Sequence, residues 1–331
     1  MDMEAVFDLV HASAFDTPTT RRLLEAKRNV GMVPGAAWCR AVCHRDSVTL
    51  LNVRTVINRA FWKMREIAMV LPGTSPSRVY LLAEAPGGFA QAVKHMWPSA
   101  HCVATSLTTD GAISFSDRVR HMVTTGLPSN GDLCAVGVIN ALVERLGAHT
   151  GDLVTADGGE TVHDLDLAEQ QSTPLAIAQV AAALRLQAKG GSAVVKIFEG
   201  STRPVRDLLR LVRSVYTDAS IFKPRTSKTA NSERYIICRA LTDPKKADAI
   251  AAFLQAALSR VVDGGEYVHR LVGNADDAVD AAFDAMANTQ ACSIEDMCYA
   301  ARHYDFAALL RQQHADAAWL RDMLGVKNKR K

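Results

Sequence analysis

Short apolar runs alternate with segments of helical periodicity through the middle of this chain, and this alternation constrains its fold most strongly. Strands that alternate with helices form a mostly parallel sheet covered on both faces. The last two apolar runs, near Ile221 and Tyr235, are joined by a loop without a helix, which predicts an antiparallel hairpin at one edge. We therefore expect an α/β fold. The other expected elements are strand Val79–Ala83, helix Phe89–Met96, strand His101–Thr105, helix Ala135–Leu146, strand Asp152–Ala156, helix Ala168–Ala188, strand Ser192–Phe198 and helix Pro204–Val215.

Helical segments flank the alternating region on both sides. The apolar spacing from Val53 to Val70 predicts one helix that Pro72 stops, and Gly190-Gly191 is expected to cap the helix before the fourth strand. We expect three parts: a helical N-terminal segment over residues 1–53, an α/β domain over residues 54–243, and a helical C-terminal extension over residues 244–331 with a basic tail.

The composition limits the class of protein more weakly. With 331 residues, 48% of them hydrophobic, the chain can bury one large core, or a core and a smaller helical domain. A net charge of +3 permits a nucleic-acid partner without arguing for one. The seven cysteines form no disulfide framework, and Cys39, Cys43 and His44 lack a partner pair at ligand spacing, so we expect no metal. Neither a signal peptide nor a membrane span is evident, which predicts a soluble intracellular protein.

A glycine turn follows the first expected strand and opens the next helix. Gly87 and Gly88 would let the backbone turn tightly and approach a ligand. Their spacing fits neither G-x-G-x-x-G nor a P-loop. A nucleotide ligand without a pyrophosphate therefore suits this turn better than NAD or ATP, although such turns are common in α/β folds.

Four charged side chains are predicted to meet where such sheets bind ligands, at the carboxyl ends of the strands. Asp157 follows one strand, Glu233 precedes the last, and Lys63 lies on the helix before the first. Singly, Asp157 is interpreted as a turn residue and Lys63 as part of a solvated face, but the mid-strand Lys196 needs a partner or a cavity. Together the four could deprotonate a weakly acidic hydroxyl, since burial and a neighbouring cation lower the pKa of a lysine. Lys63 would supply that cation, and the two carboxylates would orient both ammonium groups.

Over about residues 21–241 the sequence resembles the FtsJ-like ribose 2′-O-methyltransferases. Five segments occur in the order of that family, namely "NRAFWKM", "EAPGGF", "DLVTADGG", "VVKIF" and "FKPRTSKTANSERYIIC". The last is most similar to the cap-specific messenger-RNA branch, cellular and viral. The resemblance implies a Rossmann-like methyltransferase sheet with S-adenosylmethionine as cofactor. It also implies a catalytic tetrad of Lys63, Asp157, Lys196 and Glu233, in which Lys196 activates the ribose 2′-hydroxyl.

The resemblance implies binding residues as well. Asn58 would lie near the methionine end of the cofactor, Asp132 would read the adenosine, and Asp110 is a weaker candidate for the ribose. Glu84 stands where related enzymes often carry a small residue. Asn231 is implied to touch the RNA. The predicted cofactor-binding residues are Asn58, Ala83, Glu84, Ala85, Pro86, Gly87, Gly88, Phe89, Asp110, Asp132, Leu133 and Asp157, and the predicted substrate-binding residues are Asn231, Lys223 and Arg225.

We therefore expect an RNA 2′-O-methyltransferase acting on the first nucleotides of capped mRNA, in the nucleus or cytoplasm, or in a viral factory. The same chemistry on ribosomal or transfer RNA and a catalytically silent RNA-binding scaffold stay open as alternatives. Basic side chains of residues 1–53 and of Lys223–Lys228 are expected to hold phosphates. For residues 244–331, helical spacing favours a bundle packed on the sheet. The alternative is a surface for RNA or a partner protein, formed by Lys327–Lys331 with Arg302, Arg311 and Arg321.

Overall fold

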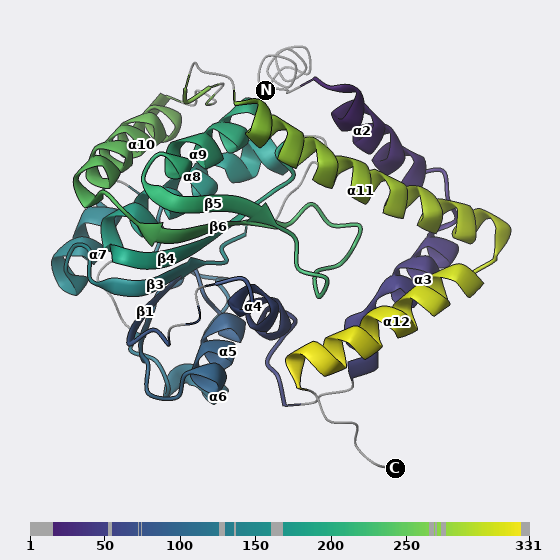
Figure 1. Cartoon of the computed structure of the whole chain (residues 1–331), viewed down its shortest axis with the longest axis horizontal. Coiled ribbons are helices and arrows are strands. Elements are labelled where there is room, and N and C mark those ends of the chain that lie inside the picture. Colours follow the sequence, from purple (N-terminus) through teal and green to yellow (C-terminus); the bar gives the residue numbers. More distant parts are fainter. Residues whose placement is uncertain are drawn as a thin grey trace.

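The computed structural model describes residues 16–51, 55–71, 73, 75–125, 130–135, 137–159, 168–264, 268, 270–272 and 276–325, in which one six-stranded sheet forms the centre (Figure 1). The strand order is β2-β1-β3-β4-β6-β5. Strands β1 to β4 are parallel, whereas β6 runs antiparallel to both β4 and β5. The predicted parallel sheet with an antiparallel pair at one edge is therefore confirmed. The strands are β1 (Arg78–Leu82), β2 (His101–Ala104), β3 (Gly151–Ala156), β4 (Gln187–Ile197), β5 (Tyr216–Phe222) and β6 (Arg234–Leu241).

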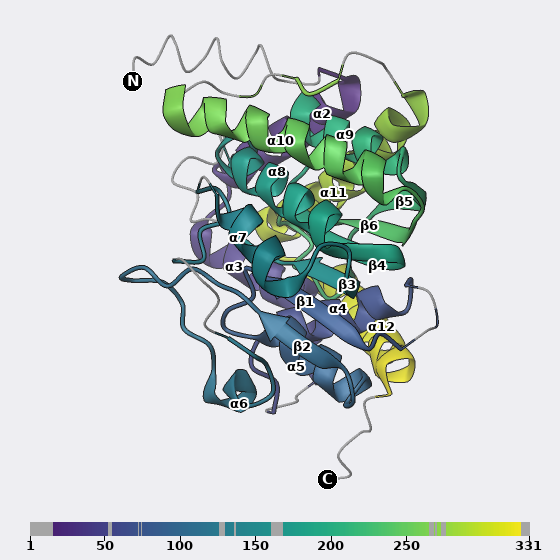
Figure 2. The same ribbon diagram turned by 90° about the vertical axis from the view of Figure 1, so that its left-hand side faces the viewer.

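Helices cover both faces of this sheet. The helices α7, α8, α9 and α10 share one apolar core with one face, and α4 and α5 share a second core with the other. Figure 2 shows α10, α8 and the sheet as successive layers. The helices are α2 (Pro18–Val30), α3 (Gly35–Arg45), the 3-10 helix η1 (Ser47–Leu51), α4 (Ala60–Ala68), α5 (Gly88–Met96), α6 (Asp117–Arg120), α7 (Val138–Leu146), α8 (Ala168–Leu186), α9 (Arg203–Arg213), α10 (Pro244–Gly264), α11 (Asp277–His303) and α12 (Ala307–Leu324).

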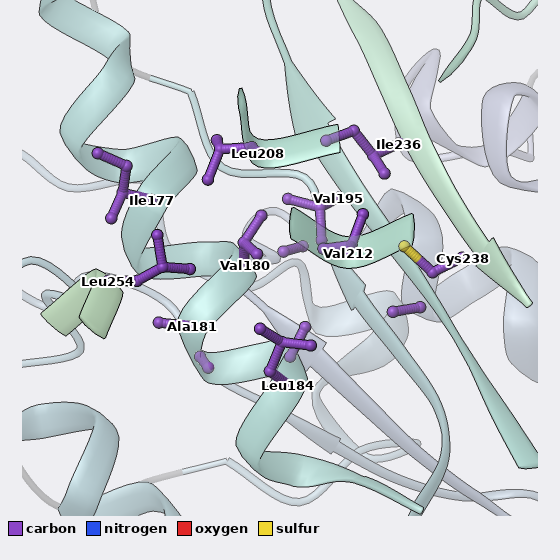
Figure 3. Packing of buried hydrophobic residues seen from close by; sticks show 14 of the residues in the cluster. Ile177, Val180, Ala181, Leu184, Val195, Leu208, Val212, Ile236, Cys238 and Leu254 are labelled. Atoms are coloured by element: carbon purple, nitrogen blue, oxygen red, sulfur yellow. The ribbon is translucent and has the colours of Figure 1, made fainter. Parts of the chain in front are cut away.

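Helix α8 is buried on nearly all sides because it lies between the sheet and α10. Its apolar side chains, Val180 and Leu184 among them, meet Val195 of β4 and Ile236 of β6 (Figure 3). Leu254 of α10 belongs to the same cluster and is fully buried. Because successive strand residues point to opposite faces, Val195 pointing toward α8 directs the next residue of β4 toward the other face. The core thus fixes the direction of Lys196.

Two local predictions were wrong. The helix predicted from Val53 begins only at Ala60. At its start, the side-chain oxygen of Asn58 accepts a 3.0 Å hydrogen bond from the Ala60 amide. Residues 53 and 54 of that prediction lie outside the described residues. The pair Gly190-Gly191 does not cap α8 but lies within β4, where the pairing with β3 shifts register. The strand therefore starts directly after Leu186, and the glycines occupy an irregular stretch of the ladder.

The helices from the two ends of the chain pack on one another. Figure 1 shows α11 and α12 beside α2 and α3. Arg22 of α2 pairs with Glu295 of α11, and Arg45 of α3 pairs with Asp316 of α12. Of the predicted RNA or partner surface, Arg302 and Arg321 instead donate to backbone carbonyls, those of Asn29 and Leu50. The tail Lys327–Lys331 lies outside the described residues.

None of the described helices combines the length and the apolar character that crossing a bilayer requires.

Candidate active site

The four predicted catalytic side chains converge on one buried site. Lys63 comes from α4, Asp157 from the turn after β3, Lys196 from β4, and Glu233 from the residue before β6. The Glu233 carboxylate lies 2.8 Å from Lys63 Nζ and 3.2 Å from Lys196 Nζ. Lys196 Nζ lies 3.6 Å from Asp157 Oδ1. Each side chain is at most 14% exposed, so two ammonium groups and two carboxylates balance one another away from water.

Two further polar residues, which the sequence did not single out, belong to this cluster. The Tyr235 hydroxyl donates a 2.7 Å hydrogen bond to Asp157 and lies 3.4 Å from Lys63 Nζ. Tyr235 stands directly opposite Lys196 in the ladder of β4 and β6, which is why both side chains reach the same face. Ser227 donates a 2.6 Å hydrogen bond to Glu233. The tetrad is therefore part of a network of six side chains.

The carboxylates of the cluster determine the protonation of Lys196. Burial lowers the pKa of Lys196, but Asp157 and Glu233 outweigh it, and the pKa lies above its ordinary value. For the Glu233 carboxyl, burial raises the pKa, but the charges of Lys196 and Lys63 outweigh burial and hold the pKa well below its ordinary value. The expectation that Lys63 lowers the pKa of Lys196 toward neutrality is therefore not met in this arrangement, because the two carboxylates have the larger effect.

The turn after β3 is shaped to receive the Lys196 ammonium. A Cβ on Gly159 would lie 3.0 Å from Lys196 Nζ, so a side chain there would crowd the ammonium. The preceding Gly158 donates its N–H to the Gln179 side chain of α8 at 2.8 Å. The Gln179 amide also donates to the Lys196 carbonyl at 3.4 Å. Gln179, which is buried, therefore ties the Asp157 turn to the strand that carries Lys196.

The predicted cofactor segment Ala83–Phe89 connects β1 to α5 beside this site. Glu84 is buried, and its carboxylate accepts a 2.8 Å hydrogen bond from the Ala90 amide at the start of α5. Burial raises the pKa of Glu84 well above its ordinary value, and the nearby Asp157 adds to this effect. A Cβ on Gly88 would lie 2.1 Å from the Asn58 side-chain oxygen. The missing side chain of Gly88 therefore makes room for Asn58, whereas the sequence analysis had assigned this space to a ligand.

The predicted adenosine-side residues lie on two loops that are joined to each other. Thr108 donates its N–H to the Asn130 carbonyl at 2.7 Å, which joins the loop after β2 to the loop that carries Asp132. Asp132 accepts from the Cys134 amide, whereas Asp110 is exposed. At the end of β2, the buried Thr105 hydroxyl has no hydrogen-bond partner within the described part of the chain. A polar ligand could satisfy it.

The predicted substrate residues lie on the loop between β5 and β6. The Lys223 ammonium donates to the Asn231 backbone and side-chain oxygens at 2.6 and 3.1 Å, and to the Glu233 carbonyl at 3.0 Å. Burial, followed by the neighbouring Arg234 guanidinium, lowers the pKa of Lys223 to about 7. The Arg225 guanidinium stacks 4.2 Å from the ring centroid of Trp319 on α12. Lys223 therefore holds the loop in shape, and its contact with phosphate stays a prediction.

The strand order and the antiparallel edge pair agree with the Rossmann-like methyltransferase sheet that the sequence resemblance implies. The sequence profile of the FtsJ-like methyltransferases matches residues 56–241, which is more than half of the chain. The chain therefore belongs to the FtsJ-like methyltransferase family, as the sequence had predicted. Among the described residues, no group of three or more His, Cys, Asp or Glu side chains is placed to hold a metal ion.

Several curated relatives are cap-specific mRNA (nucleoside-2′-O-)-methyltransferases. The sequence is 33% identical to methyltransferase 1 of Leishmania braziliensis over 190 residues, 52% of this chain and 48% of the relative. It is 30% identical to the mouse methyltransferase 1 over 66% of this chain and 30% of the relative. For methyltransferase 2 of Drosophila melanogaster, the identity is 38% over 33% of this chain and 16% of the relative. The chain thus spans less than half of each relative's length.

A solved structure of a ribosomal RNA methyltransferase from Plasmodium falciparum aligns to 56% of this chain and 97% of its own, with 15% identity and a TM-score of 0.40.

Proposed function

We propose that this chain is an S-adenosylmethionine-dependent ribose 2′-O-methyltransferase acting on the first nucleotides of capped mRNA. The observation that carries the proposal is the convergence of Lys63, Asp157, Lys196 and Glu233 within an FtsJ-like fold. A scaffold protein has no need of two buried lysines, whose desolvation costs stability unless every charge is paired.

The role of each catalytic residue follows from its contacts. Lys196 is held at its ammonium by two carboxylates and faces the turn after β3, so it would bind the 2′-oxygen and receive or polarise its proton. As an ammonium, Lys196 orients the oxygen by donating a hydrogen bond; a further positive charge nearby would lower its pKa and favour proton transfer. Lys63, Asp157 and Glu233 fix its position. Most of the acceleration would come from orientation.

The described residues beside the tetrad fit the cofactor. The Thr105 hydroxyl, which has no partner among the described residues, and the Glu84 carboxyl offer polar groups after β2 and β1, and Asp132 offers another on the loop before α7. When bound, S-adenosylmethionine supplies a methyl group that its sulfonium already activates. We assign Asn58 and Asp132 to its two ends, and Ala83–Phe89 to the wall between them.

Capped mRNA is the proposed substrate because each of the three curated relatives is a cap-specific mRNA methyltransferase. Asn231, exposed on the loop that carries Glu233, is assigned to the RNA. Arg225, also exposed, is assigned to a phosphate. Contact with a partner protein through α10, α11 and α12 stays a prediction.

The experiment that tests the chemistry uses two RNAs that differ in one oxygen. With radiolabelled S-adenosylmethionine, the protein is expected to methylate a short capped RNA and to give a 2′-O-methylated nucleoside on digestion. The same RNA with a 2′-deoxy sugar at the mapped nucleotide should take up no label. Transfer to the deoxy RNA, or label on a base, would overturn the proposed reaction.

A further inference from the structure

The loop that carries Asn231 and Glu233 is anchored from outside the sheet domain by α11. Gln290 of α11 is 2% exposed, and its amide nitrogen donates to the carbonyls of Ala230 at 3.3 Å and Asn231 at 3.1 Å. Its amide oxygen accepts a 3.2 Å hydrogen bond from the Arg234 guanidinium. One side chain of the C-terminal extension therefore contacts residues on both sides of Glu233.

A second anchor comes from the N-terminal helix α2. Lys27 donates to the Ser232 hydroxyl at 2.9 Å and also pairs with the Glu199 carboxylate. Glu199 in turn accepts a 2.8 Å hydrogen bond from Ser232. Burial raises the pKa of Glu199, but Lys27 outweighs it and keeps the pKa below its ordinary value. Since α2 packs along α11, the two anchors belong to one helical unit.

We propose that the helical unit of α2 and α11 positions the loop Ala230–Glu233 for catalysis, and that Gln290 is its main positioning residue. The inference rests on the proposed function and assigns a role to the C-terminal extension. Glu233 contacts both catalytic lysines, and its position depends on a loop that has no ladder partner of its own before Arg234. A displacement of about 1 Å at such a group can cost about 100-fold in rate.

The chemistry of the amide explains why glutamine suits this position. Its nitrogen has two donor hydrogens for two carbonyls, and its oxygen accepts a hydrogen bond from one nitrogen of the Arg234 guanidinium, which is itself fully buried. A glutamate there keeps an acceptor for Arg234 but loses both donors and turns a carboxylate oxygen toward Ala230 and Asn231. Gln290→Glu therefore separates loop anchoring from the pairing of Arg234.

The test compares Gln290→Glu with Thr289→Ala, a neighbour on α11 that is exposed and whose hydroxyl bonds within its own helix. We expect Gln290→Glu to lower kcat by roughly 10- to 100-fold and raise the RNA KM, with unchanged affinity for S-adenosylmethionine. Thr289→Ala should behave as wild type in each respect. Gln290→Met, which removes both donor and acceptor, should show the same kinetic loss together with a lower melting temperature.

Hydrogen–deuterium exchange gives a readout that needs no activity. Backbone amides of residues 226–233 should exchange faster in Gln290→Glu than in Thr289→Ala, while those of β1 and β3 stay unchanged. Exchange equal in both variants would overturn the anchoring, whereas faster exchange with wild-type kinetics would overturn the role of the anchored loop in catalysis. If the wild-type protein methylates no RNA, the proposed function fails on its own, and the exchange experiment still decides whether Gln290 anchors the loop.

Discussion

Replacing Lys196 with methionine should remove catalysis while leaving the fold nearly as stable as before. The loss of a group that takes part in proton transfer typically costs about 100- to 10,000-fold in rate. Stability should change little because both partners of Lys196 keep another: Glu233 retains Lys63 at 2.8 Å and Ser227 at 2.6 Å, and Asp157 retains the Tyr235 hydroxyl at 2.7 Å. The removal of a buried ammonium also cancels its desolvation cost. We expect destabilisation below about 2 kcal/mol, against about 3–5 kcal/mol when a buried partner is left unpaired.

The assay pairs initial rates of methyl transfer to capped RNA with urea unfolding at pH 7. Lys189→Met is the matched control, because it makes the same change at an exposed position of the same strand. Lys196→Arg should be as inactive as Lys196→Met, because a planar guanidinium cannot take the place of the compact ammonium between Asp157 and Glu233. Near-normal turnover of Lys196→Met would refute the catalytic role of Lys196. A large loss of stability would show that Glu233 and Asp157 do not keep sufficient partners without it.

Three further predictions concern Glu233, Asp132 and the basic tail. Glu233→Gln should destabilise by about 3–5 kcal/mol in urea at pH 7, because Lys63 and Lys196 both lose their shared carboxylate. The lowered pKa of Glu233 contributes stability that is present above about pH 4.5 and is lost as pH falls, so wild type should lose more stability on acidification than Glu233→Gln. Asp132→Ala should weaken S-adenosylmethionine binding about tenfold by calorimetry, the equivalent of one charged hydrogen bond. Deleting Lys327–Lys331 should leave the salt dependence of RNA binding parallel to wild type.

Each of these has an outcome that contradicts it. Equal urea midpoints for Glu233→Gln and wild type would mean that the cluster does not depend on this carboxylate. Unchanged cofactor affinity in Asp132→Ala would remove its loop from the site. A flatter salt slope after the tail deletion would assign phosphate contacts to the tail.

The convergence of the tetrad was predictable because the carboxyl ends of parallel strands meet at one edge. The alternation of strands with helices along the chain was enough to place Asp157 and Lys196 there, and Glu233 followed from its position before a strand. Tyr235 was missed because an aromatic residue in an apolar strand indicates core packing. Its pairing opposite Lys196 depends on the register of β4 with β6, which no local pattern specifies.

Contacts between distant segments account for the rest. Gln290 lies 56 residues beyond Arg234 in the sequence, and helical periodicity does not say which polar residue of α11 will be buried against a loop. Lys223 was expected to hold a phosphate, and the structure adds that its ammonium donates to the carbonyls of Asn231 and Glu233, contacts that the local sequence does not specify. The space beside Gly88 was assigned to a ligand and is filled by the protein's own side chain. Such assignments need the tertiary structure.

The decisive measurement compares methyl transfer to capped and uncapped versions of the same short RNA, with the modified nucleotide mapped. We predict transfer to the ribose 2′-oxygen of one of the first nucleotides of the capped RNA, and little or none to the uncapped RNA. Equal transfer to both RNAs, or a modified nucleotide far from the 5′ end, would contradict it.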